Sequence, residues 1–235
     1  NATGVDGDWT LEYSSGAAIA SDFTVSGYSY DLVASASSWS ELQTDISSHI
    51  SSITLAADLS ATSTITLNYD VSIDGGSHSI SNGGASAYFA IIGTGTDATL
   101  SNITVKGATA STVTMASGTT LTLSGDTFTG NNAVSSGGAI CAMNGGVTVN
   151  IHNSSFSDNT ASSSGDIAQG GAIFLGAKSI LNIETNIASG STGTTSFVHN
   201  TITGTNIGGI YGGAIYAGSG STINIATNSS GNASV

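Results

Sequence analysis

The sequence contains very few basic residues. Two Lys and no Arg stand against fifteen acidic residues, which gives a formal net charge of −13. A surface of this charge repels phosphate backbones and other anionic polymers, so we expect no nucleic-acid partner. The shortage of Lys and Arg also removes most of the cationic groups that catalysis uses.

Proline is absent and cysteine occurs once, as Cys141. A single cysteine excludes an intrachain disulfide framework, and we expect Cys141 to be a small buried apolar residue within a strand. No apolar run is long enough to span a bilayer, so we expect no membrane insertion by this segment. Because an initiator Met and an apolar signal region are both missing, we interpret the sequence as a mature or excised segment of a secreted protein.

The second half of the sequence repeats three short motifs in a fixed order. Each copy contains Phe-x-x-Asn, then Gly-Gly-Ala-Ile, then an apolar–Asn–Ile triplet. The first two motifs place these residues in corresponding positions: Phe128, Asn131, Gly137 and Gly138; Phe156, Asn159, Gly170 and Gly171; Phe197, Asn200, Gly212 and Gly213. Repeats of this length indicate a chain built as a stack of similar coils.

Short strands with apolar residues at every second position fill the sequence from residue 53 onward, and Gly, Asn, Asp or Ser bound each strand. A β-sandwich and a parallel β-solenoid both satisfy this pattern. Only the solenoid gives the same motifs a reason to recur in the same order, because each coil meets similar neighbours. We therefore predict an all-β fold, a parallel β-helix (solenoid) over residues 53–235.

The repeated residues have expected structural roles in such a stack. The three Phe are predicted to form an internal aromatic column. The three Asn are predicted to lie at turns, where Asn tolerates left-handed backbone geometry and can form a hydrogen-bonded ladder. The Gly-Gly pairs are predicted to form sharp turns at which a side chain would strike the adjoining coil. Residues 160–169 and 187–196 are predicted to be loops that bulge from the stack.

Residues 37–52 are predicted to form a short amphipathic helix. Ser38 and Glu41 match a capping box, and Trp39, Leu42, Ile46 and Ile50 follow at helical spacing. A helix here would cover the apolar end of the first coil, so we interpret it as an N-terminal capping helix. Residues 1–36 form a separate strand-like segment with alternating aromatic residues, which either extends the cap or pairs with another molecule.

The alternating Phe-x-x-Asn and Gly-Gly-Ala-Ile motifs of residues 128–215 resemble the repeats of chlamydial polymorphic outer-membrane proteins and similar autotransporter passengers. The stretch Asp70–Ile80 is also similar to an opening coil of many right-handed β-helices, including those of carbohydrate-active enzymes. The resemblance implies a right-handed parallel β-helix displayed on a bacterial cell surface and acting in adhesion. The partner would be a host or neighbouring cell surface, and we expect no enzymatic activity and no cofactor.

Other functions remain open at this stage. A structural subunit of an extracellular filament or layer would pair end to end with copies of itself by strand addition. A polysaccharide lyase or hydrolase is disfavoured, because Lys106 and Lys178 are far apart in sequence and no acidic cluster recurs on one face. Asp6 and Asp8 flank a glycine and are weak candidates for a calcium loop. Ice binding is disfavoured because the Thr positions show no fixed register between copies.

Overall fold

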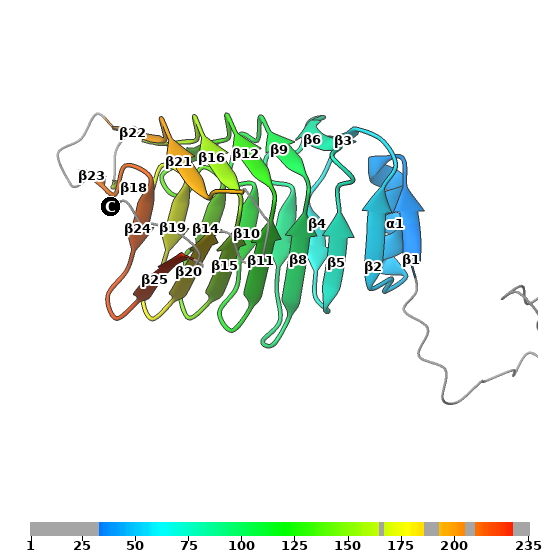
Figure 1. Ribbon diagram of the computed structural model, residues 1–235. Coiled ribbons are helices and arrows are strands. Elements are labelled where there is room, and N and C mark those ends of the chain that lie inside the picture. The colour runs from blue at the N-terminus through cyan, green and yellow to red at the C-terminus, as the bar shows by residue number, and fades with distance from the viewer. Residues whose placement is uncertain (1–32, 165–166, 186–192, 205–209, 228–235) are drawn as a thin grey trace, which may run out of the picture. The chain divides into compact units, whose positions relative to one another are not determined.

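The computed structural model describes residues 33–164, 167–185, 193–204 and 210–227. All of them belong to the unit Asp31–Val235. Asp6 and Asp8, the weak candidates for a calcium loop, and most of the predicted segment 1–36 lie outside the described residues. Every described strand pair is parallel, and the strands of successive coils lie side by side (Figure 1), so the predicted parallel β-helix is confirmed.

The largest sheet, sheet A, has eight strands and receives one strand from each coil. Its strands in order are β1 (Val33–Ala36), β2 (Ser52–Leu55), β5 (Val71–Asp74), β8 (Asp97–Ser101), β11 (Thr120–Ser124), β15 (Thr148–His152), β20 (Ile180–Thr185) and β25 (Thr222–Thr227). Alternate residues point inward and outward along each strand. The inward residues of sheet A form apolar columns in register, such as Ile73, Leu100, Leu123, Ile151 and Ile183.

Two six-stranded sheets, B and C, complete each coil. Sheet B contains β3 (Leu59–Ala61), β6 (Ser79–Asn82), β9 (Thr104–Lys106), β12 (Thr127–Thr129), β16 (Ser155–Ser157) and β21 (Ser196–Val198). Sheet C contains β4 (Ile65–Leu67), β7 (Phe89–Ile91), β10 (Val113–Met115), β14 (Ile140–Ala142), β19 (Ile173–Leu175) and β24 (Ile215–Ala217). Strands of three or four residues suffice because each pairs with a neighbour on both sides except at the ends of the stack.

The later coils carry two additional small sheets between sheets B and C along the chain. Sheet D contains β13 (Asn132–Val134), β17 (Thr160–Ser163) and β22 (Thr201–Gly204), and sheet E contains β18 (Ala168–Gln169) and β23 (Ile210–Tyr211). The prediction that residues 160–169 form a loop was therefore wrong, since most of them are in β17 and β18. Asn102, between β8 and β9, adopts a left-handed conformation with φ of 52°, which separates these two strands.

The single described helix, α1 (Trp39–Ser47), begins at Ser38, whose hydroxyl accepts a hydrogen bond from the Glu41 backbone N–H at 3.2 Å. The Glu41 carboxylate accepts from the backbone N–H of Ser37 at 2.8 Å, one residue before the position that a capping box requires. Trp39, Leu42 and Ile46 are buried. The indole N–H of Trp39 donates to the Ser63 carbonyl at 3.1 Å.

Helix α1 contacts β3 and β4, which are the end strands of sheets B and C. It therefore covers those two sheets at the N-terminal end of the stack. In sheet A the stack starts earlier than predicted, because β1 pairs in register with β2. The boundary drawn at residue 53 was wrong for this reason: the first described strand, beginning at Val33, precedes the helix, and the helix takes the place of two strands in the first described coil.

Candidate functional site

The three Phe of the repeat meet in one column inside the stack. Phe128 pairs in register with Phe156, and Phe156 with Phe197. The rings are stacked, with centroids 5.2 Å apart in the first pair and 4.8 Å apart in the second. Phe128 and Phe156 are fully buried, whereas Phe197 is partly buried because it lies near the last described coil.

The three Asn of the repeat also meet, in a buried ladder. The Asn131 amide donates to Asn159 Oδ1 at 2.9 Å, and the Asn159 amide donates to Asn200 Oδ1 at the same distance. The expectation that these Asn adopt left-handed backbone geometry was wrong. The residue before each Asn does so instead: Gly130, Asp158 and His199 have φ of 62°, 55° and 53°. That turn places the following Asn side chain inside, where the ladder satisfies its polar groups.

The two glycines of each Gly-Gly pair have different structural roles. The first glycines, Gly137, Gly170 and Gly212, have positive φ, which only glycine adopts at no steric cost. The second glycines bring neighbouring coils into direct backbone contact. Gly138 N–H donates to the Gly171 carbonyl, and Gly171 N–H to the Gly213 carbonyl, both at 2.9 Å. A Cβ on Gly138 or Gly171 would collide with backbone of the next coil.

A third, outward column runs along sheet A. It consists of hydroxyl and amide side chains that are in register across seven strands. These are Ser52, Ser72, Thr99, Thr122, Asn150, Asn182 and Asn224. We call this set the polar column. Its amides are joined: Asn182 donates to Asn150 Oδ1 at 2.8 Å, and Asn224 donates to Asn182 Oδ1 at 2.8 Å. Thr99 and Thr122 are in register, but the column continues as Asn rather than Thr in the later strands.

The charged residues that lyase or hydrolase chemistry would use are dispersed. Lys106 lies on β9 of sheet B, and Lys178 lies at the turn between β19 and β20. Asp158 lies 3.6 Å from the imidazole of His199, and Asp70 accepts a hydrogen bond from the Asp97 backbone N–H. Among the residues that the structure describes, no group of three or more His, Cys, Asp and Glu could hold a metal ion. Within the same residues no helix is long and apolar enough to cross a membrane.

Asp126 is the one buried carboxylate in the described part of the chain, with 1% of its surface exposed. One carboxylate oxygen accepts from the Ile103 backbone N–H at 2.9 Å and the other from Ser124 N–H at 3.0 Å. Burial raises the pKa of Asp126 to about 7, although these two hydrogen bonds act in the opposite direction. The side chain ties two coils together at the turn from sheet A to sheet B.

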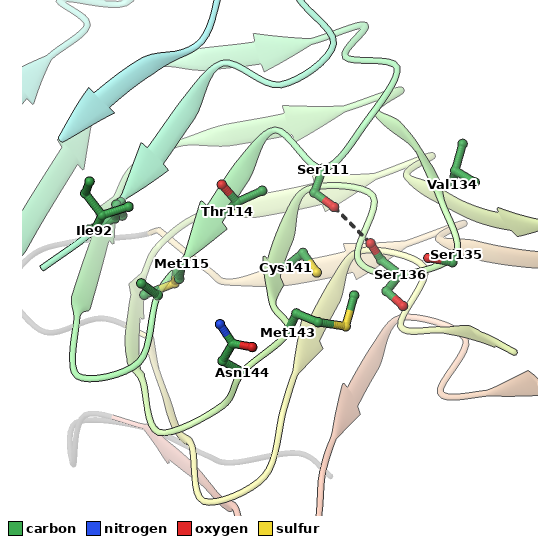
Figure 2. Close-up of a pocket in the computed structure, with 12 residues that line it drawn as sticks. Ile92, Ser111, Thr114, Met115, Val134, Ser135, Ser136, Cys141, Met143 and Asn144 are labelled. Carbon is green, nitrogen blue, oxygen red and sulfur yellow. Dashed lines mark hydrogen bonds between the residues drawn. The ribbon is translucent and has the colours of Figure 1, made fainter. Parts of the chain in front are cut away.

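A hollow of about 430 Å³ opens on the outer side of sheet C (Figure 2). Thr114 and Cys141, which are register partners on β10 and β14, lie next to each other along it. Val134 and Ser136, at the end of β13, line one side, and Ile92 and Met143 line the others. We call this the sheet C hollow. It forms where sheet D begins, between coils with and without that extra sheet.

The sheet C hollow is lined entirely by uncharged residues. The Ser111 hydroxyl donates to the Ser136 carbonyl at 2.9 Å and fastens the β13 side to the preceding coil. Burial raises the pKa of the Cys141 thiol, so the thiol is protonated at neutral pH. Ser135 has φ of 82°, a left-handed geometry that is uncommon for a residue with a side chain and turns the chain sharply at this side.

The sequence analysis did not identify the sheet C hollow. Its residues come from separate coils, and only the fold brings them together. One signal was available in the composition: the chain has a single Cys and two Met, and all three line this hollow. Sulfur-containing side chains are rare in the sequence, and their gathering in one place marks the hollow as chemically distinct from the Ser- and Thr-rich outer faces.

Comparison of the chain with protein-family models, with curated proteins and with solved structures found no match. The class to which the chain belongs is therefore defined by its own geometry, which is that of a parallel β-helix with a helical cover over two of its three main sheets. The resemblance to polymorphic outer-membrane proteins stays a prediction.

Proposed function

We propose that this protein is a non-enzymatic extracellular surface protein that acts as an adhesin, attaching a bacterial cell to a host or neighbouring cell. The observation that carries the proposal is the polar column of sheet A. It offers hydroxyl and amide groups at a regular spacing of about 4.8 Å on a backbone that is hydrogen-bonded on both sides. A rigid array of this kind suits repetitive, hydroxyl-rich polymers such as the glycans of a cell surface. Many weak contacts can add up, because the side chains of the array are already ordered and lose little conformational entropy on binding.

Charge supports a neutral partner for this face. The chain has a net charge of −13, and the central members of the polar column, Thr99 to Asn182, carry no charge. Anionic glycans would be repelled by the overall field, whereas neutral glycans would meet only hydrogen-bonding groups. Bacterial surface display and secretion belong to the same proposal, and they rest on the resemblance of the repeat motifs.

Attachment of cells to beads coated with the purified chain tests the proposal. We expect beads coated with the wild-type chain to retain more cells than albumin-coated beads do. Beads coated with the double variant Asn150→Asp/Asn182→Asp should lose most of this retention. The matched control is Ser155→Asp/Ser196→Asp, which adds the same charge to a register pair on the outer face of sheet B. Equal retention by the two double variants, or none by the wild-type chain, would contradict the proposal.

A second function, that of a subunit assembled end to end in an extracellular filament or layer, is favoured by the apolar character of β25. Ile223 and Ile225 on this strand are 45% and 74% exposed. Sedimentation velocity over a range of protein concentrations distinguishes the two functions. Concentration-dependent growth that Ile225→Asp abolishes would favour the subunit, and a monomer at every concentration would exclude it.

A further inference from the structure

Exposed apolar side chains gather at the sheet C hollow. Ile92, Val134 and Met143 surround it and are 43%, 75% and 59% exposed. The other large apolar residues that are exposed in the described part of the chain lie on β1, just before β18 or on strands β20 to β25. Apolar residues collected around a concavity mark a binding surface more reliably than scattered ones do.

The interior of the hollow combines apolar surface with a few polar groups. Met115 and Cys141 are almost fully buried and contribute soft, polarisable sulfur atoms. Thr114, Ser135 and Asn144 add hydroxyl and amide groups, and Thr114 already donates to the Phe89 carbonyl at 3.4 Å. A volume of about 430 Å³ lies within the range of small-molecule sites, about 300–1,000 Å³.

Charge restricts the chemistry of the occupant. No Lys, Asp, Glu or His lines the hollow, so a charged ligand would lose its hydration without gaining an opposite charge. An anion would also meet the field of a chain with a net charge of −13. A sugar would place many hydroxyl groups against the apolar rim formed by Ile92, Val134 and Met143. The remaining class is a neutral, mainly apolar molecule with at most one or two hydrogen-bonding groups.

We propose that the sheet C hollow is a binding site for a small neutral apolar molecule that fits within its volume of about 430 Å³. The ligand rests on Thr114 and Cys141, and Ile92, Val134 and Met143 close over its edges. The site is independent of the polar column on sheet A, so cell attachment and ligand binding are separate properties of the stack.

Two fluorescent probes that differ in a single group test the proposal. N-phenyl-1-naphthylamine is neutral, and 8-anilinonaphthalene-1-sulfonate has the same aromatic skeleton with an added sulfonate. Titration of the purified chain should give saturable fluorescence enhancement with the neutral probe at one site per chain. The anionic probe should bind at least about tenfold more weakly. Equal binding of both probes, or no saturable binding of the neutral probe, would overturn the proposal.

A matched pair of variants locates the site. Val134→Asp places a carboxylate at the rim of the hollow, and Val33→Asp makes the same change at a position of similar exposure, 71% against 75%, on β1. Both positions are open to solvent, so both variants should keep the wild-type melting curve. We expect Val134→Asp to raise the Kd of the neutral probe about tenfold or more and Val33→Asp to change it less than about twofold. Similar effects of the two variants would overturn the assignment.

The single cysteine supplies a second readout. Because Cys141 is the only thiol in the chain and lines the hollow, alkylation by N-ethylmaleimide reports on this place alone. Saturating neutral probe should slow alkylation several-fold in the wild-type chain, and clearly less in Val134→Asp at the same probe concentration. An alkylation rate unaffected by bound probe would place the probe elsewhere and overturn the proposal.

Discussion

Phe156 lies flat on Phe128, with ring planes 6° apart, although the two residues are on different coils of the stack. Phe197 continues the column with a ring plane 7° from that of Phe156. Registered strands therefore bring identical side chains together, and the core is built by repetition along one axis rather than by contacts among unlike elements. The energetic consequences can be measured residue by residue.

Phe156→Ala should destabilise the fold more than any other truncation in the column. Phe156 is fully buried between two rings, so its removal leaves a cavity and unstacks both neighbours. We expect a loss of about 3–5 kcal/mol in the free energy of unfolding, measured by urea denaturation. Phe197→Ala, at a partly buried position, should cost clearly less. Equal losses at the two positions would show that the column is not organised as described.

The two Asn ladders should differ in their contribution to stability. Asn159 is buried, and its side chain makes hydrogen bonds with Asn131, Asn200 and the Phe128 carbonyl. Asn159→Ala leaves several buried polar groups without partners, and we expect a loss of about 3 kcal/mol. Asn182→Ala acts on the solvent-facing polar column, where water replaces the lost bonds, and should cost about 1 kcal/mol or less. A larger loss in the free energy of unfolding for Asn182→Ala than for Asn159→Ala would contradict this prediction.

Stability should depend on pH through Asp126. Its pKa is raised to about 7 in the folded chain, above the value of about 3.9 in an unfolded one. Between these two pKa values the folded state binds one proton more than the unfolded state, so the stability present at low pH is lost as the pH rises to about 7 and is constant above it. Between pH 5.5 and 8.5 we expect the free energy of unfolding to fall by about 2 kcal/mol.

The variant Asp126→Asn isolates this effect from that of other titrating groups. Subtracting its pH profile from that of the wild-type chain should leave a fall that continues up to about pH 7 and levels off above it. The pKa of nearby Asp74 is lowered by hydrogen bonds from Gly76 N–H and the Asn102 amide, so Asp74 stays ionised over this range. Parallel profiles for the two proteins between pH 5.5 and 8.5 would refute the assignment.

Glycine is required at Gly171 and at Gly130 for different reasons, so alanine should have different costs at the two positions. A Cβ on Gly171 would collide with the backbone of Gly213 and Thr201, which belongs to the next coil and cannot move alone. Gly130 has open space around it, and alanine there meets only the strain of φ near 62°, about 1–2 kcal/mol. We expect Gly171→Ala to lower the midpoint of thermal unfolding, followed by circular dichroism, clearly more than Gly130→Ala does.

The repeat motifs predicted the fold because their spacing encodes which strands become neighbours. Strand positions such as Val149–Ile151 and Leu181–Ile183 followed from alternation of apolar residues, and the two are in register in the structure. The start of the stack at Val33 was missed because a four-residue strand before a helix carries little periodicity. The turn geometry before Asn131 was missed because the left-handed residue varies between copies as Gly, Asp and His.

The sheet C hollow could not be predicted from local patterns. Ile92 follows β7, whereas Val134 and Met143 belong to a coil two turns further along the stack, and their positions depend on the point at which sheet D is added. Val134 lies in a strand of three residues with no repeat motif of its own, so neither periodicity nor spacing distinguished it. Only the register between coils places these side chains around a single space.

Distances between spin labels along the polar column test the central claim, that the coils are stacked in parallel and in register. In a Cys141→Ser background, labels at Ser72 and Asn182 are separated by four strand spacings, and labels at Ser72 and Asn224 by five. The backbone positions of the two pairs are about 19 Å and about 24 Å apart. Pulsed electron–electron double resonance should therefore show a distance between labels that is longer in the second pair by one strand spacing of about 4.8 Å. Separations that do not increase from the first pair to the second, or that differ by several strand spacings, would contradict the account.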